Sequence, residues 1–256
     1  MSRTRVSQSV ALLSLALALP ASAGPTSHAM EVDGDGAVLF VDLQRGRLLR
    51  FHEGELSVAS ELTGVPAGDH LRNLVMSITG ELYLGEKKTV WKIGEDGSVE
   101  STKPPAELKA LFIKRPADLA PDGSVYVARD FKNIERSLPG GDAHPVLTTD
   151  IISKIYSMAV TPYGRVFFGN NTEVAKLTAE GEVEMVLEIK EGSVLGLAAL
   201  GERAVLLLRR HEKDAVSLER IHINGNREVL LSVDQIASVT SGSPVKIATS
   251  EQVGQE

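Results

Sequence analysis

The sequence predicts an all-β protein, a β-propeller built from four-stranded antiparallel blades. Short stretches of alternating apolar residues recur along the chain, glycine turns recur beside them, and no segment keeps a helical period. A unit of four short strands that repeats at intervals of about 40 residues is typical of a propeller blade. The recurring strands begin at Val38, Leu82, Val125, Val166, Val205 and Val245.

The segment before the first unit has the pattern of an export signal. Arg3 and Arg5 precede a short apolar run, Val10–Leu19, and the small residues of Ala21-Ser22-Ala23 follow it. The run is shorter than the roughly 20 apolar residues that span a bilayer. We therefore expect a signal peptide at residues 1–23, a mature chain that starts at Gly24, no membrane span, and a periplasmic or secreted protein.

Composition limits the chemistry of the chain. Apolar residues make up 43% of it, which is enough for a sizeable core, and there is no cysteine. Disulfides, thiolate catalysis and cysteine-ligated metal sites are therefore excluded. The net charge of −7 argues against binding to nucleic acid or to anionic membranes, and we expect a monomer.

Each repeat carries two further registers. The third strand of the unit reads "LLRF", "VWKI", "IERS", "VAKL" and "LERI", and its third residue is always basic. Strand alternation places this residue on the solvent side while its neighbours pack. A glycine turn follows each of these strands, at Gly54, Gly97, Gly140, Gly181 and Gly225, where a tight hairpin needs a positive φ.

The ends of the repeat array leave the number of blades open. Only "SEQVGQE" follows Thr249, so the sixth unit has no room for its last two strands. We expect a propeller domain at residues 24–249 with six blades, the last one incomplete, and a tail at 250–256. The alternative is five blades plus a C-terminal extension. Pro104–Phe112 could form one or two helical turns between blades, with Pro105 at the start.

The stretch "RPADLAPDGSVYVARD", with the basic and glycine registers behind it, resembles the superfamily of NHL-repeat proteins. That superfamily also includes the senescence-marker/gluconolactonase lactonases and the streptogramin lyases. The resemblance implies a six-bladed propeller and says little about activity.

The lactonase branch implies a divalent metal at the top of the channel, held by a Glu, two Asn and an Asp. The corresponding positions here carry His28 (or Ser27), Arg115, Tyr156 and Val194, none of them a carboxylate or an Asn. The late His–Glu pair of the lyases is not found either. We expect no metal and no cofactor, with Ca or Zn only if a lactonase-like activity holds. These differences favour a binding protein over an enzyme.

One rim of the propeller gathers positive charge. The loops there carry His28, Arg72, Arg115, Tyr156, Arg129, Asn170 and Arg209, and Asp118 and Glu31 lie one layer below. Arginine side chains suit carboxylate or phosphate groups. We expect an exported, non-catalytic propeller that binds a protein partner or an anionic ligand at this rim. The alternatives are solvated loop charge without a ligand, and a divergent lactonase-like hydrolase or lyase.

Overall fold

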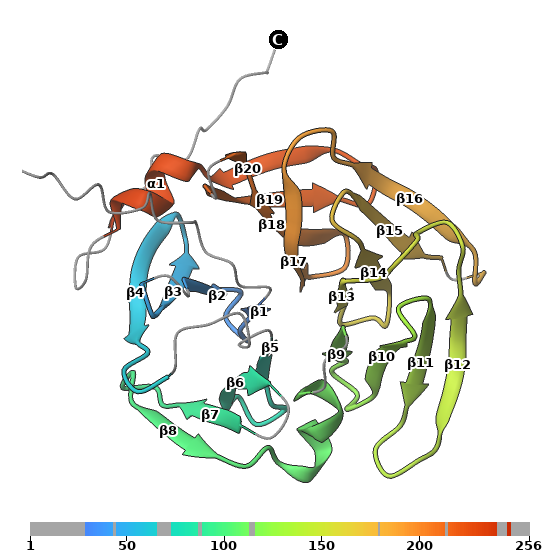
Figure 1. The fold of residues 1–256 in the computed structure, drawn as a ribbon, viewed down its shortest axis with the longest axis horizontal. Coiled ribbons are helices and arrows are strands. Elements are labelled where there is room, and N and C mark those ends of the chain that lie inside the picture. Colours follow the sequence, from blue (N-terminus) through green and yellow to red (C-terminus); the bar gives the residue numbers. More distant parts are fainter. Residues whose placement is uncertain are drawn as a thin grey trace, which may run out of the picture.

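The computed structural model describes residues 29–42, 45–65, 73–86, 89–112, 116–178, 180–212, 215–239 and 245–246. The expected signal peptide at 1–23 and tail at 250–256 lie outside this part of the chain. The described strands form five antiparallel sheets arranged as blades around a central channel (Figure 1). The predicted fold class, an all-β propeller of four-stranded blades, is confirmed.

In every blade the first strand is innermost and the second, third and fourth follow outward in chain order. Blade 1 has β1 (Met30–Val32), β2 (Val38–Asp42), β3 (Arg47–His52) and β4 (Glu55–Glu61). Blade 2 has β5 (Asn73–Met76), β6 (Leu82–Glu86), β7 (Thr89–Ile93) and β8 (Val99–Thr102). Blade 3 has β9 (Ala117–Leu119), β10 (Val125–Arg129), β11 (Asn133–Ser137) and β12 (Ala143–Thr148).

The two remaining blades continue in chain order. Blade 4 has β13 (Ser157–Val160), β14 (Val166–Gly169), β15 (Glu173–Leu177) and β16 (Val183–Glu188). Blade 5 has β17 (Ser193–Leu200), β18 (Ala204–Arg210), β19 (Val216–His222) and β20 (Arg227–Leu231). A short helix, α1 (Val233–Ser238), follows blade 5. Within the described ranges no helix is long and apolar enough to cross a membrane.

The structure has five blades, so the favoured count of six is wrong and the five-blade alternative is confirmed. The sixth unit supplies only β21 (Val245–Lys246), which pairs antiparallel with β4 through Val245 opposite Leu56. A two-residue strand cannot bury a face of its own. It therefore extends the outer edge of blade 1 as a fifth strand instead of forming a separate sheet.

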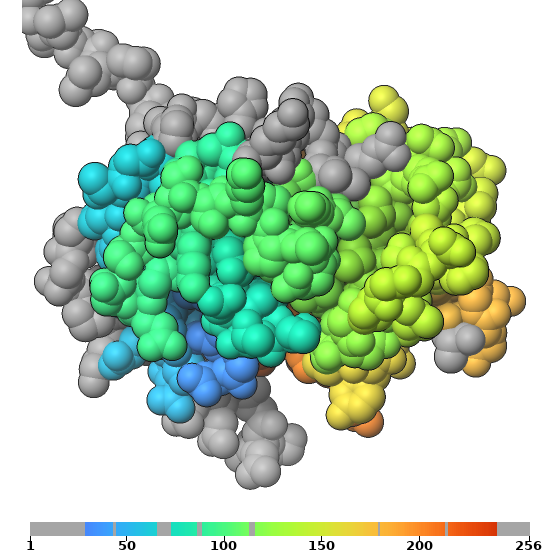
Figure 2. Space-filling view, turned by 90° about the horizontal axis from the view of Figure 1, so that it is seen from below, coloured from blue at the N-terminus to red at the C-terminus, as the bar shows by residue number. Residues whose placement is uncertain are grey.

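The short helical stretch predicted near Pro104–Phe112 is a 3₁₀ helix, η1 (Ala106–Phe112). Its side chains Leu108, Leu111 and Phe112 are fully buried and pack between blades 2 and 3, against Tyr83 and Val125 among others. Figure 2 shows blade 2 (cyan to green) and blade 3 (yellow-green) side by side around this segment. The helix thus fills the space between two blades.

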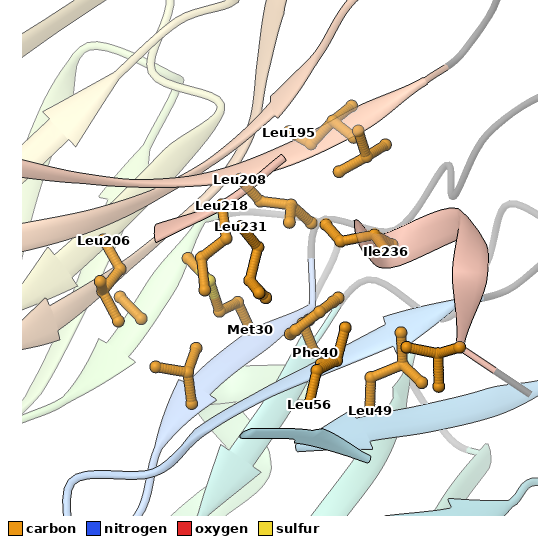
Figure 3. Close-up of a cluster of buried hydrophobic side chains, with 14 residues drawn as sticks. Met30, Phe40, Leu49, Leu56, Leu195, Leu206, Leu208, Leu218, Leu231 and Ile236 are labelled. Carbon is orange, nitrogen blue, oxygen red and sulfur yellow. The ribbon is translucent and has the colours of Figure 1, made fainter. Parts of the chain in front are cut away.

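The ring closes by apolar packing between blades 5 and 1. Met30, Phe40, Leu49 and Leu56 of blade 1 meet leucines of β17, β18, β19 and β20, and Ile236 of α1 covers them (Figure 3). The buried Arg47 fixes the chain after α1, because its Nη1 donates to the Val239 carbonyl oxygen at 3.1 Å. Its Nη2 lies 3.1 Å from Oδ2 of buried Asp42.

The repeat registers have structural roles. Each glycine that was predicted to form the turn after a third strand has a positive φ, for example 79° at Gly54 and 84° at Gly225. The basic residues of the third strands each pair with an acid of the same blade, as Lys176 does with Glu184 at 2.8 Å and Arg220 with Glu228 at 3.2 Å. These bases tie together parts of one blade, which agrees with a structural rather than a chemical role.

Candidate functional site in the central channel

The inner strands of all five blades enclose a cavity of about 670 Å³ along the propeller axis. This volume lies within the range of about 300–1,000 Å³ that small-molecule sites occupy. Its wall is about half polar and half apolar, and the polar side chains come from different blades. The wall residues that matter below are Glu31, Asp33, Asp118, Phe131, Tyr156 and Ser157.

Two carboxyl groups in the wall occupy the same register position on blades 1 and 3. On β1, Glu31 comes directly before Val32, which pairs with Val38 at the start of β2. On β9, Asp118 comes directly before Leu119, which pairs with Val125 at the start of β10. Equal register in a propeller means equal height along the axis. Blades 2 and 4 carry Val75 and Ala159 at this height, so the carboxyl groups alternate with apolar residues.

Each of these carboxyl groups accepts a hydrogen bond from a backbone N–H group of the next blade. One Asp118 oxygen accepts a hydrogen bond from the Val160 N–H of β13 at 2.5 Å, and the other accepts from Leu119 N–H at 2.8 Å. Glu31 accepts from the Met76 N–H of β5 at 3.4 Å and from Val32 N–H at 3.1 Å. These bonds fix both side chains and satisfy backbone donors at the inner edge of the neighbouring blade.

The environment of the pair favours its protonated form. Burial, together with the neighbouring Asp118 carboxylate, raises the pKa of Glu31 to about 8. Burial also raises the pKa of Asp118 to about 7. The backbone hydrogen bonds act in the opposite direction on both groups, and the cost of desolvating two carboxylates exceeds their effect.

A third polar group in the wall has no partner in the described part of the chain. The Oγ of Ser157, the first residue of β13, is buried, with 8% of the residue exposed, and it makes no hydrogen bond there. A buried hydroxyl without a partner costs about 1–3 kcal/mol.

Two aromatic side chains lie at one end of the channel. Phe131 and Tyr156 contact each other edge to face, with ring centroids 6.0 Å apart and an interplanar angle of 62°. Tyr156 is 40% exposed. Phe131 has a φ of 61° and the preceding Asp130 a φ of 55°. Such left-handed conformations in non-glycine residues cost about 1–3 kcal/mol each and cluster at functional sites.

The structure brings two of the predicted rim residues to this cavity, Asp118 and Tyr156. The predicted site residues His28, Arg72 and Arg115 lie outside the described residues, so the anion-binding rim stays a prediction. Sequence reasoning placed Glu31 near the site but did not select it. Its position five residues before turn glycine Gly36 matches that of Asp118 before Gly123, and this was the available signal. Nothing in the sequence indicated Phe131 or Ser157.

The other three predicted rim residues make contacts within the fold. Arg129 Nε lies 3.0 Å from Glu135 Oε2 on the adjacent strand. The Asn170 side-chain oxygen accepts from the Thr172 and Glu173 N–H groups at 2.8 Å, which fixes the turn between β14 and β15. None of the three lines the channel cavity. A ligand role for them stays a prediction.

Arg209 belongs to a buried charged cluster between blades 4 and 5. Its Nη1 lies 3.5 Å from Oε1 of Glu219, whose other oxygen lies 2.6 Å from Arg227 Nε. Glu219 is fully buried, and Arg209 also donates to the Glu191 carbonyl oxygen. Two cationic partners thus balance the charge of the carboxylate within the fold, while its Oε2 accepts no hydrogen bond from a described residue.

Ser217 and His211 adjoin this cluster in an arrangement unlike that of a serine nucleophile. The Ser217 hydroxyl donates to Glu219 Oε1 at 3.0 Å. His211 Nε2 lies 2.7 Å from the Ser217 Oγ. Burial and the nearby Arg209 lower the pKa of His211. A nucleophilic serine must give its proton to the histidine, whereas here the proton points to the carboxylate. Ser217 is also buried away from solvent.

The positions that the lactonase resemblance assigns to a metal do not fit one in the described residues. Tyr156 packs on Phe131, and Val194 is a buried apolar side chain at the interface of blades 4 and 5. Within the ranges that the structure describes, no three His, Asp or Glu side chains are grouped to hold an ion.

No protein-family model matches the sequence. No curated protein matches it either.

Among solved structures, the chain is similar to virginiamycin B lyase from Staphylococcus aureus, at 13% identity over 82% of this chain and 70% of the lyase, with a TM-score of 0.40. It is also similar to a gluconolactonase from Xanthomonas campestris, at 12% identity over 80% and 75%, with a TM-score of 0.45. The calcium-binding protein regucalcin from Agrobacterium tumefaciens gives 15% identity over 81% and 73%, with a TM-score of 0.41. The neighbours are thus lyase-type and lactonase-type propellers, but similarity at this level carries no argument about function.

Proposed function

We propose that this protein is a ligand-binding propeller that takes a small organic molecule into its central channel. The observation that carries the proposal is the cavity of about 670 Å³ that the inner strands of all five blades enclose, with the Glu31 and Asp118 carboxyl groups in its wall. Sites for small molecules are concave and mostly apolar, with a few polar groups that fix orientation. Glu31 and Asp118 are such groups, and Phe131 with Tyr156 forms an aromatic wall at one end.

The methionines of the chain provide a direct test of this proposal. Met30, Met76 and Met158 line the channel, whereas Met185 is 45% exposed on β16 at the outer edge of blade 4. In protein labelled with ¹³C at the methionine methyl groups, a fragment library should contain compounds that shift the three channel signals. The Met185 signal should stay in place and serves as the internal control. If no compound moves the channel signals, the proposal is wrong.

We also propose that the protein is exported, with residues 1–23 removed. The support is the pattern of Arg3 and Arg5, the apolar run and the Ala-Ser-Ala site. Intact mass of the protein recovered from periplasm or medium should correspond to a chain that starts at Gly24. A recovered species that still carries residues 1–23 contradicts the proposal.

A second candidate function is a divergent hydrolase or lyase. The raised pKa values of Glu31 and Asp118 favour it, because a carboxyl group that stays protonated near neutral pH can act as a general acid. If this candidate holds, turnover of lactone substrates should fall by about 100-fold or more in Asp118→Asn. A binding protein would instead show no turnover above that of a Glu188→Gln control, which changes an exposed residue of β16.

A further inference from the structure

We propose that a hollow between blades 4 and 5 binds the phosphate group of a small polar molecule. The hollow has a volume of about 570 Å³, and the residues that line it are Arg165, Glu202, Arg203, His222, Ile223 and Asn224. This volume is within the range of about 300–1,000 Å³ that small-molecule sites occupy. The set shares no residue with the wall of the central channel, so the proposal is independent of the channel function.

Three turns of the two blades form the hollow. Arg165 ends the turn between β13 and β14, Arg203 ends the turn between β17 and β18, and Asn224 lies between β19 and β20. Because neighbouring strands of a blade are antiparallel, the turns after first strands and after third strands lie at the same end of the propeller. Phe131 and Tyr156 belong to loops of the other end. The hollow therefore opens at the end of the molecule away from the aromatic pair.

The two arginines of the hollow differ from the other arginines that the structure describes. Neither Arg165 nor Arg203 makes an ion pair or a side-chain hydrogen bond with a described residue. The arginines with a side-chain partner are Arg45, Arg47, Arg50, Arg129, Arg136, Arg209, Arg210, Arg220 and Arg227. The arginines without a partner thus line the same hollow, and a guanidinium group without a counter-ion is a receptor for an oxyanion.

The neutral polar groups of the wall are donors as well. The Asn226 N–H donates to Asn224 Oδ1 at 3.0 Å, so the side-chain Nδ2 of Asn224 remains as a donor. The imidazole ring of His222 carries an N–H in either charge state. Ile223 is the one apolar residue among the described residues that line the hollow. A ligand that matches this wall must therefore supply acceptors.

Glu202 is the one acid among the described residues of the wall, and its carboxylate interacts with a tyrosine. The Tyr163 hydroxyl donates to the Glu202 carboxylate, which raises the pKa of that hydroxyl. Glu202 forms no ion pair with a described arginine. The two guanidinium groups therefore outweigh the single carboxylate, and the charge of the wall favours an anion.

A phosphate group matches the two arginines better than a carboxylate does. A guanidinium fork binds two oxygens of either group through parallel N–H bonds, so one arginine is enough for a carboxylate. A phosphate monoester carries three acceptor oxygens and a charge of about −1.5 to −2 at pH 7, so it can receive both arginines. The rest of the hollow leaves room for a small polar body, because its wall is polar except at Ile223.

The test follows the two arginines directly. In the whole mature protein with ¹⁵N-labelled arginine, the Nε–Hε signals of Arg165 and Arg203 should shift on titration with inorganic phosphate and with glycerol 3-phosphate. The Arg45 signal, from a residue paired with Asp42, should stay in place as the internal control. Acetate and glycerol are the matched probes, and sodium chloride keeps the ionic strength constant. We expect both phosphates to bind at least about tenfold tighter than acetate.

Two variants test the site in opposite directions by calorimetric titration. Arg165→Gln/Arg203→Gln removes both guanidinium groups and should weaken the binding of glycerol 3-phosphate by about 100-fold. Glu202→Gln removes the negative charge of the wall and should tighten binding by about two- to fivefold, a gain that unfolding cannot produce. The control Lys103→Gln/Lys109→Gln removes two exposed positive charges outside the hollow and should leave the affinity unchanged.

The outcomes decide both the site and the class of ligand. Acetate that shifts the two arginine signals as strongly as phosphate would show general screening only, and the inference would be overturned. Equal affinity in the double arginine variant overturns it as well. Binding of inorganic phosphate without glycerol 3-phosphate would make the proposed ligand class wrong. If circular dichroism shows that the double variant is unfolded, the wild-type arginine signals and the Glu202→Gln affinity decide, and the absence of both changes contradicts the proposal.

Discussion

A carboxyl group is fully buried at the interface of blades 4 and 5, and two are partly buried in the central channel, but the surroundings of these groups differ. Glu219 in the interface contacts Arg209, Arg227 and Ser217, and the two arginines balance its negative charge. Glu31 and Asp118 in the channel have backbone donors only. The difference between the two regions therefore lies in the counter-ions, which balance Glu219 and have no described equivalent beside Glu31 and Asp118.

The largest expected effect on stability is in the charged cluster around Glu219. Glu219→Ala leaves Arg209 buried without its counter-ion, and removal of one partner of a buried ion pair costs about 3–5 kcal/mol. Urea unfolding should show a free energy of unfolding lower by that amount. The control Glu228→Ala, which removes an exposed partner of Arg220, should cost less than about 1 kcal/mol. Equal losses in the two variants would contradict the distinction between the regions.

The next effect is a dependence of stability on pH that arises in the channel. The raised pKa values mean that the folded protein holds protons that the unfolded chain has released. Their contribution to stability is complete below the ordinary values of 4.5 and 3.8, and it is lost as pH rises to about 8. Glu31→Gln/Asp118→Asn should remove this loss, and near pH 9 its free energy of unfolding should exceed that of the wild type by at least about 3 kcal/mol.

The outcome that would contradict this expectation is a double variant whose free energy of unfolding follows the wild type across the whole range. Denaturant unfolding at about pH 5, 7 and 9 makes the comparison. The variants Glu180→Gln and Glu188→Gln serve as the control, because exposed carboxylates should leave the profile unchanged in this range.

Substitution of two buried serines should change stability by different amounts in the two regions, with a difference of about 1 kcal/mol. Ser217→Ala removes a hydroxyl that bonds Glu219 and His211, and it should destabilise the protein by about 1–2 kcal/mol. Ser157→Ala removes a hydroxyl without a described partner, and it should be neutral or slightly stabilising. Thermal melts of the two variants side by side measure the difference. A destabilised Ser157→Ala would mean that the hydroxyl has a partner in the folded protein.

The smallest expected effect is at the strained end of the channel. Phe131→Gly relieves a φ of 61° but loses the contact with Tyr156. Relief of the backbone strain and loss of the aromatic contact change the free energy of unfolding in opposite directions, by about 1 kcal/mol each. We therefore expect little change in stability and weaker ligand binding. A matched Phe40→Gly change in the core should instead cost at least about 3–5 kcal/mol. A large loss of stability in Phe131→Gly would assign Phe131 a purely structural role.

The site was only partly predictable. The positions of Glu31 and Asp118 before their turn glycines follow from the repeat, because equal phase in the sequence becomes equal height in a propeller. That phase does not say which carboxylate finds a counter-ion, since the answer depends on neighbours from other blades. Arg209 illustrates the same limit: its loop position indicated a free rim charge, and the structure pairs it with Glu219 ten residues away.

The sequence by itself determined the propeller, because alternation, glycine turns and the interval of the repeat are local properties that each unit carries. It could not decide the number of blades. That number depends on whether Val245 and Lys246 gain more by forming a new sheet or by adding to β4, a contact between opposite ends of the chain. Only the tertiary structure brought Glu31, Asp118 and Ser157 to one cavity. Burial and the absence of a described counter-ion arise there from the packing of inner strands that lie far apart in sequence.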